Sequence, residues 1–165
     1  MNTRAAVSGL LVCCAALLAC KKVKVPAPWE PYVPTEGLSN AIPMSTYGSQ
    51  PPQIRLFYKR SKVDVNELKS GFETRFQGMG LEKIWECTDI PDKPAAGFAK
   101  APQQYVDYSV NPLTPETWNA QVAKTDKITR IGLPQKRQCV WLPAAAKVCG
   151  SVPTSSECHI SLQAH

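Results

Sequence analysis

The sequence predicts an α+β domain, a ferredoxin-like βαββαβ sandwich that continues into a C-terminal disulfide-stapled β extension. Between residues 53 and 133 the apolar residues recur with a period of two, typical of strands, or of three to four, typical of helices. The order of these patterns is that of a split βαβ arrangement. Three of the last four cysteines follow residue 135, which favours a cross-linked extension there.

The first half of the sandwich has clear local signals. Residues 53–59, "QIRLFYK", alternate between apolar and polar positions and predict a strand. Asp64 is a suitable helix N-cap, and Glu67 three residues later completes a capping box. The apolar face of the helix that follows is made by Val65, Leu68, Phe72, Phe76 and Met79. Gly78 and Gly80 predict the end of this helix, and residues 81–87 predict the next strand.

The second half begins with a loop rich in Pro, Ala and Lys, followed by a predicted strand over residues 104–110. A second helix is predicted after it, because Thr114 is a suitable N-cap and Pro115 occupies the favoured first helical position. Leu113 and Trp118 stand at the positions of a hydrophobic staple.

The last predicted strand of the sandwich covers residues 127–133. Beyond residue 135 no helix cap is present, and three short strands are predicted at residues 138–143, 145–149 and 158–163. These strands would form the β extension.

The amino terminus has the layout of a secretory signal peptide. One positive charge, Arg4, precedes an apolar run over residues 5–19 that is too short to span a bilayer as a mature helix. The last residues, Leu17-Leu18-Ala19-Cys20, resemble the lipobox of bacterial lipoproteins. The alternatives are an ordinary cleaved signal peptide with a chance cysteine and a retained anchor, which the lysines after residue 20 disfavour.

The lipobox resemblance implies a location and an attachment chemistry. Residues 1–19 would be removed, and Cys20 would become the acylated first residue, carrying diacylglycerol and palmitate-like chains that hold the protein on a membrane. Lys21 stands where an Asp favours retention in the inner membrane of enterobacteria. The resemblance therefore implies the periplasmic face of the outer membrane, with the inner membrane as the alternative.

Residues 20–52 are expected to form the lipid anchor and a proline-rich periplasmic tether, and residues 53–165 the domain. Seven of the 15 prolines lie between residues 21 and 52, and no regular apolar period is present there. Within this stretch "PWEPYVP", residues 28–34, is either a partner-binding segment or a pair of aromatic rings that lie over the domain or at the lipid interface.

The cysteine count predicts two disulfides. Of seven cysteines, Cys13 and Cys14 lie in the signal peptide and Cys20 is the acylation site. The remaining four are Cys87, Cys139, Cys149 and Cys158. Three connectivities are open; the preferred one pairs Cys149 with Cys158 across a Gly, Pro and Ser-rich turn, which leaves the other two cysteines as a pair.

Catalytic signals are weak, and we expect the chain not to be an enzyme. The two histidines, His159 and His165, have no nucleophile motif around them. The carboxylates of Glu82, Glu86, Asp89 and Asp92 lie close in sequence, but a strand and a turn account for them. No phosphate-binding glycine motif is present, and no cofactor or metal is expected.

The formal net charge of +6 is spread along the chain, so no nucleic-acid partner is expected. The sequence thus favours a lipid-anchored protein-binding module facing the periplasm, for example an immunity or inhibitor protein that neutralises a toxin or hydrolase. The alternative is a structural or assembly component of an envelope or secretion complex. The membrane, reached through acylated Cys20, and a periplasmic protein are the expected partners.

Overall fold

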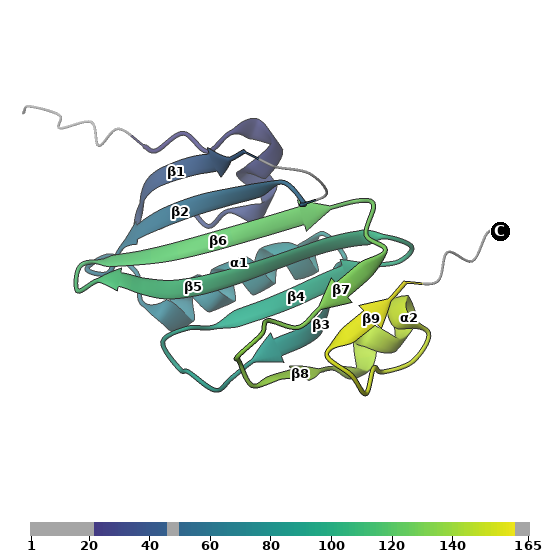
Figure 1. The fold of residues 1–165 in the computed structure, drawn as a ribbon. Coiled ribbons are helices and arrows are strands. Elements are labelled where there is room, and N and C mark those ends of the chain that lie inside the picture. Colours follow the sequence, from purple (N-terminus) through teal and green to yellow (C-terminus); the bar gives the residue numbers. More distant parts are fainter. Residues whose placement is uncertain (1–21, 46–49, 161–165) are drawn as a thin grey trace, which may run out of the picture.

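The computed structural model describes residues 22–45 and 50–160, and seven strands of this part form one antiparallel sheet (Figure 1). From edge to edge the strands are β1 (Leu38–Met44), β2 (Gln53–Lys59), β6 (Thr117–Thr125), β5 (Gln104–Thr114), β4 (Ala95–Lys100), β3 (Glu82–Cys87) and β8 (Cys139–Trp141). A second sheet pairs β7 (Arg130–Gly132) with β9 (Glu157–His159). The helices are η1 (Ala27–Tyr32), α1 (Val65–Gly78), η2 (Pro143–Ala145) and α2 (Ala146–Cys149).

Helix α1 begins where its capping box predicts. The Asp64 carboxylate accepts hydrogen bonds from the backbone N–H groups of Asn66 and Glu67 at 2.7 and 2.9 Å. The Glu67 side chain in turn accepts one from the Asp64 N–H at 2.8 Å. Leu68, Phe72 and Phe76 recur every four residues and are fully buried, so this face of α1 packs on the sheet.

The main core between α1 and the sheet is aromatic. Phe72 stacks on Tyr108 of β5 with ring centroids 5.0 Å apart, and Phe76 meets Phe98 of β4 edge-on at 5.2 Å. Such pairs add to the free energy of burial of their rings. The Tyr58 hydroxyl group, at the same interface, donates to the Pro34 carbonyl at 2.9 Å.

The second predicted helix was wrong, because residues 117–125 form strand β6. Thr114 and Thr117 pair at the end of a tight hairpin, so Thr114 ends β5 and caps no helix. Trp118, Ala120 and Val122 are buried at a period of two, whereas Leu113, the expected staple residue, is 55% exposed. Trp118 and Val122 are four residues apart, a spacing that puts two residues on one face in a helix and in a strand alike.

The N-terminal segment differs from the extended tether that its prolines predict. Residues 25–33 pack on the core, with Trp29 5% and Val33 1% exposed, and β1 adds an edge strand to β2. Prolines fit here because one lies at the start of η1, and Pro43 lies in an edge strand, which has one unpaired side. The burial of Trp29 against the core favours one interpretation of "PWEPYVP", that of aromatic rings packed on the domain.

The C-terminal unit, residues 127–160, also departs from the predicted strands. The predicted strand 127–133 contributes only β7, which pairs with β9 outside the main sheet. Residues 145–149 form the end of η2 and α2, where Gly150 adopts a left-handed conformation. A second core forms where this unit covers β3–β5, and it includes Ile84, Ala95, Tyr105, Ile131, Val148 and Ile160.

The described residues therefore form a mixed α/β fold dominated by an antiparallel sheet, with few helices and two disulfides. The ferredoxin-like order is not found, because one expected helix is a strand and β4 occupies the expected Pro, Ala and Lys-rich loop. The β extension is present in part, as β8 and β9.

Candidate functional site

The two faces of the main sheet have different surroundings (Figure 1). One face packs against α1 and η1. On the other face the C-terminal unit covers β3–β5, and no described element covers the part formed by β1, β2, β6 and the adjoining end of β5. We call this part the open face. Strand alternation assigns to it Asn40, Ile42, Gln53, Arg55, Phe57, Ser109, Asn111, Asn119 and Gln121.

The open face is polar, with an aromatic ring among amides. Gln121 donates a side-chain hydrogen bond to Gln53, its neighbour across the β2–β6 pair. Arg55 Nε and Asn119 Oδ1 are buried atoms without a hydrogen-bond partner in the described part of the chain. Phe57 lies directly opposite Asn119 and is half-buried. These side chains can make hydrogen bonds and apolar contact with another molecule from a rigid platform.

At the border of the open face the sheet and the C-terminal unit form a cleft of two adjoining cavities, about 460 and 320 Å³ in volume. Both cavities are lined by Asp107 of β5 and Gly132 of β7. We call them together the Asp107 cleft. The larger is also lined by Gln50, Pro51, Pro52, Tyr105, Thr125, Lys127, Ile128, Thr129, Arg130 and Ile131. The smaller is also lined by Trp85, Ala95, Tyr108, Ser109, Asn111, Pro134 and Arg137.

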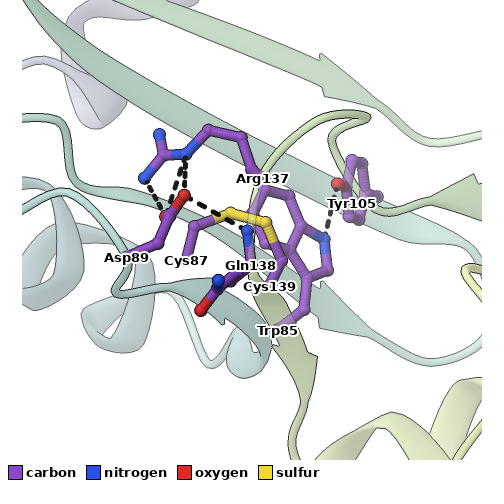
Figure 2. The surroundings of a disulfide bond; sticks show 7 residues. All are labelled: Trp85, Cys87, Asp89, Tyr105, Arg137, Gln138 and Cys139. Atoms are coloured by element: carbon purple, nitrogen blue, oxygen red, sulfur yellow. Dashed lines mark hydrogen bonds and ion pairs between the residues drawn. A yellow bond between two sulfur atoms is a disulfide. The ribbon is translucent and has the colours of Figure 1, made fainter.

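A short hydrogen-bonded chain leads to Asp107. Trp85 Nε1 donates to the Tyr105 hydroxyl oxygen at 3.0 Å, as Figure 2 shows. Asp107 lies two residues further along β5 on the same face, where the Tyr105 hydroxyl group is close enough to lower the pKa of its carboxyl group. The Trp85 indole lies against Gly97 of the neighbouring strand, where only a residue without a Cβ leaves room.

Burial changes the protonation of both acids in this chain. It raises the pKa of the Asp107 carboxyl group to about 6, an effect that the hydrogen bond from Tyr105 partly offsets. Burial, and then the neighbouring Asp107 charge, raise the pKa of Tyr105 well above its usual value. Asp107 makes no ion pair within 4.0 Å in residues 22–45 and 50–160, so no cation lowers its pKa there.

We expect an Asp107→Asn variant to be more stable than the wild type at pH 7, by about 2 kcal/mol, with the difference lost below pH 4. The folded wild type keeps a proton that the unfolded chain releases between pH 4 and 6, so its free energy of unfolding falls as pH rises through that interval. A shift of roughly two pKa units limits the effect to about 3 kcal/mol. The side-chain amide of Asn has a carbonyl oxygen, so the variant keeps an acceptor near Tyr105 while the titrating group is removed. Urea unfolding of both proteins at pH 3.5, 5 and 7 measures the difference, and a difference independent of pH would contradict the assignment.

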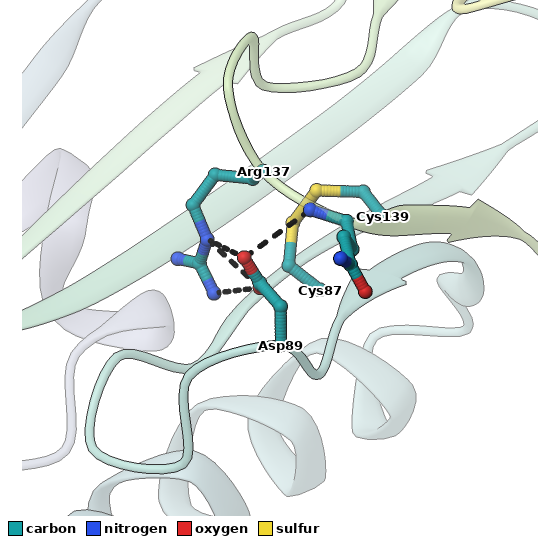
Figure 3. A network of polar contacts seen from close by, with 5 residues as sticks. Cys87, Asp89, Arg137 and Cys139 are labelled. Atoms are coloured by element: carbon teal, nitrogen blue, oxygen red, sulfur yellow. Dashed lines mark hydrogen bonds and ion pairs between the residues drawn. A yellow bond between two sulfur atoms is a disulfide. The ribbon is translucent and has the colours of Figure 1, made fainter.

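The corner beside the cleft is fixed by a disulfide and an ion pair (Figure 3). Cys87 and Cys139 are cross-strand partners of β3 and β8, with Cα atoms 4.0 Å apart. Arg137 donates to Asp89 through Nη2 at 2.7 Å and Nε at 3.0 Å, and the Gln138 N–H donates to the same carboxylate. The Arg137 hydrogen bonds are the main cause that lowers the pKa of Asp89. Asp89 therefore ties the loop after β3 to the segment before β8.

The other carboxylates of the predicted strand and turn are not gathered into one site. Glu82 accepts from Lys147 of α2 at 2.6 Å, and Glu86 accepts from Lys83 at 3.1 Å. Lys83 also pairs with Glu73 of α1 at 2.9 Å. Asp92 is exposed in the loop before β4. Structural ion pairs thus account for three of the four carboxylates, namely Glu82, Glu86 and Asp89.

The remaining predicted residues divide between described and undescribed parts. His159 lies in β9 with a side chain 76% exposed, 3.9 Å from Glu157. Cys149 and Cys158 form the second disulfide, so both disulfides have the preferred pairing. Cys20 and His165 lie outside the described residues. Within the described ranges no group of three or more His, Cys, Asp or Glu side chains is arranged to hold a metal ion.

Tyr105 and Asp107 were not among the residues that the sequence predicted for a site. The signal was present in "QYVDYSV", because alternation puts these two residues with Ser109 on the face opposite the buried Val106, Tyr108 and Val110. What sequence did not reveal is that Trp85 and the C-terminal unit lie against that face.

Comparison of the chain with family models, with curated proteins and with solved structures finds no match. None of the helices in the described part of the chain is long and apolar enough to cross a membrane.

Proposed function

We propose that this chain is a lipid-anchored lipoprotein of the outer membrane that faces the periplasm and binds another protein, as an immunity or inhibitor protein binds a toxin or hydrolase. It acts by occupying its partner and not by catalysis. Three observations support the proposal: the lipobox-like residues 17–20, the two disulfides and the open face. Disulfides persist in oxidising compartments such as the periplasm, so the second observation agrees with the first.

The open face is the observation that carries the binding role. Its side chains stand on four strands of a hydrogen-bonded sheet, so little conformational entropy is lost when a partner orders them. It offers donors, acceptors and a central ring, the mixture found at protein interfaces. Ile42, at its edge, is 41% exposed.

We expect a Cys20→Ser variant to remain an unprocessed precursor without acyl label. The hydroxyl group of Ser is a much poorer nucleophile than a thiolate, so the lipid is not attached and the peptidase that acts on the lipidated form does not cut. Metabolic labelling with palmitate and the mobility of the chain on a gel measure both steps. Cys14→Ser, in the apolar run of the signal peptide, is the matched control and should be processed and labelled normally. Efficient cleavage of Cys20→Ser with unchanged membrane attachment would contradict the lipoprotein assignment.

Affinity capture from native envelope extract tests the binding role. The bait is residues 21–165, which contain every described residue, oxidised in a periplasm. We expect one stoichiometric partner, a secreted hydrolase or toxin that loses activity when bound. Phe57→Lys should lose this partner, whereas Gln77→Lys, which places the same residue on the exposed surface of α1, should keep it.

Other outcomes have distinct meanings. A partner retained equally by both variants would remove the open face from the proposal but keep the binding role. If the soluble bait retains nothing while the full-length protein sediments with a large envelope complex, the structural or assembly role replaces the proposed one.

A further inference from the structure

We propose that the Asp107 cleft is a binding site for a guanidinium or primary ammonium group carried on a slim aliphatic stem. This goes beyond the proposed function, because the site would take such a group from a protein side chain or from a free small molecule. It rests on the cleft and not on the open face.

The shape of the cleft suits a small ligand. The larger cavity, of about 460 Å³, lies within the range of small-ligand sites. Its walls come from separate parts of the chain: Pro51 and Pro52 before β2, Tyr105 and Asp107 on β5, and the segment 127–132. A depression formed by three segments is held open by the fold and needs no rearrangement of one loop.

The charge at the centre of the cleft is negative. Among the described residues, Asp107 is the only carboxylate that lines either cavity, and it lines both. An ionised carboxylate accepts about four hydrogen bonds, and the neighbouring Tyr105 hydroxyl group can supply at most one of them. The remaining oxygen positions suit a group with two parallel donors, which is the geometry of a guanidinium. A partly buried carboxylate without an ion pair gains more from a cation than a fully exposed one does.

Three described cations line the Asp107 cleft, but none of them pairs with Asp107. Arg137 lines the smaller cavity, but two of its nitrogens are held by Asp89 at 2.7 and 3.0 Å. Arg130 lines the larger cavity and lies 3.6 Å from Glu157. Lys127 is an exposed residue of the same wall and is not within ion-pair distance of Asp107. Within residues 22–45 and 50–160 no cation therefore pairs with this carboxylate, and it is free to pair with an external one.

The lining around the carboxylate is partly apolar. Ile128, Ile131 and the two prolines offer an apolar wall for methylene groups, and Thr125 and Thr129 offer hydroxyl groups. An apolar wall that ends at one partly buried charge fits the side chain of Arg or Lys, whose stem is apolar and whose head is charged. An anion would be repelled by Asp107.

The test uses N-acetyl-arginine methylamide as the probe and its citrulline analogue, which has nearly the same shape and no charge, as the control. The full oxidised chain in detergent micelles is titrated while the Trp85 indole N–H signal, assigned with a Trp85→Phe variant, is followed by NMR. We expect a saturable shift with the arginine compound and at least tenfold weaker binding of the citrulline compound. Binding should weaken about tenfold from pH 7.5 to 5, as Asp107 takes up its proton.

Two variants keep the result interpretable. Asp107→Asn should lose at least tenfold in affinity while the Trp85 signal keeps its position, because Tyr105 retains its partners. Asp92→Asn, which removes an exposed carboxylate, should bind as the wild type does. Equal binding of the citrulline compound, or wild-type affinity in Asp107→Asn, would overturn the proposal, as would the absence of a saturable shift.

The same titration, carried out with a peptide and with a free amine, distinguishes the two possible sources of the cation. If Gly-Gly-Arg-Gly-Gly binds at least as well as agmatine, the site is suited to the side chain of a protein. If agmatine binds and the peptide does not, the ligand is a free amine. Both outcomes support the site, and neither depends on capture of a partner at the open face.

Discussion

The Cys87→Ala/Cys139→Ala variant is expected to lose about 4 kcal/mol of unfolding free energy. This disulfide joins residues 52 positions apart, and loop-closure entropy makes the constraint on the unfolded chain larger for a longer loop. Strand β8 has only three residues. It is an edge strand of the main sheet, and its one strand neighbour in that sheet is β3. Loss of the cross-link should therefore release β8 and the wall of the smaller cavity with it.

The matched comparison is Cys149→Ala/Cys158→Ala, whose cysteines are nine positions apart and whose removal should cost only about 2.5 kcal/mol. Guanidinium unfolding of the three proteins measures both values. The reverse order of the two costs would show that native contacts, and not the length of the closed loop, determine the effect.

A Gly97→Ala variant is expected to lose about 3 kcal/mol and to open the Asp107 cleft. The new methyl group would fall 2.8 Å from Trp85 Cδ1 and closer still to Nε1, so the indole must move off the sheet. Overpacking of this kind costs about 1–3 kcal/mol, and the movement also breaks the hydrogen bond from Trp85 to Tyr105.

Gly78→Ala is the control for this change, because a Cβ at the end of α1 meets no atom within 4 Å. It should match or slightly exceed the wild type in stability. Urea unfolding gives the free energies, and the Trp85 indole signal reports the movement. A Gly97→Ala protein of wild-type stability with an unshifted indole signal would show that Trp85 has another place to pack.

Local signals predicted the parts of the fold that depend on neighbours in sequence. The capping box at Asp64 and the alternation over 53–59 are such signals, and α1 and β2 follow them closely. Strand β4 was missed because Ala95, Ala96, Gly97 and Ala99 are too small to signal burial by themselves. Trp85 lies against Gly97, and the C-terminal unit packs over Ala95 and Ala99, which are contacts between residues far apart in sequence.

The candidate site was harder to predict than the fold for the same reason. Trp85, Tyr105 and Gly132 line the Asp107 cleft from three different strands, and only the topology brings them together. The disulfide pairing was accessible because one pair spans a short turn and four cysteines leave only one partner for each of the others. The functions of the N-terminal residues remain predictions from the lipobox resemblance.

Because η1 and β1 pack on the domain, the linker between a lipidated Cys20 and the folded domain is short. Val25 is already buried, so only four residues, 21–24, lie between the lipidated cysteine and the folded domain. Even fully extended, the five residue steps from Cys20 to Val25 reach about 17 Å, less than the diameter of a small domain. With Cys20 lipidated, as proposed, the domain would lie close to the bilayer surface, where the exposed Lys22 and Lys24 would contact anionic headgroups. Its partner would be met in a thin layer at the membrane, and the search for it would be close to two-dimensional.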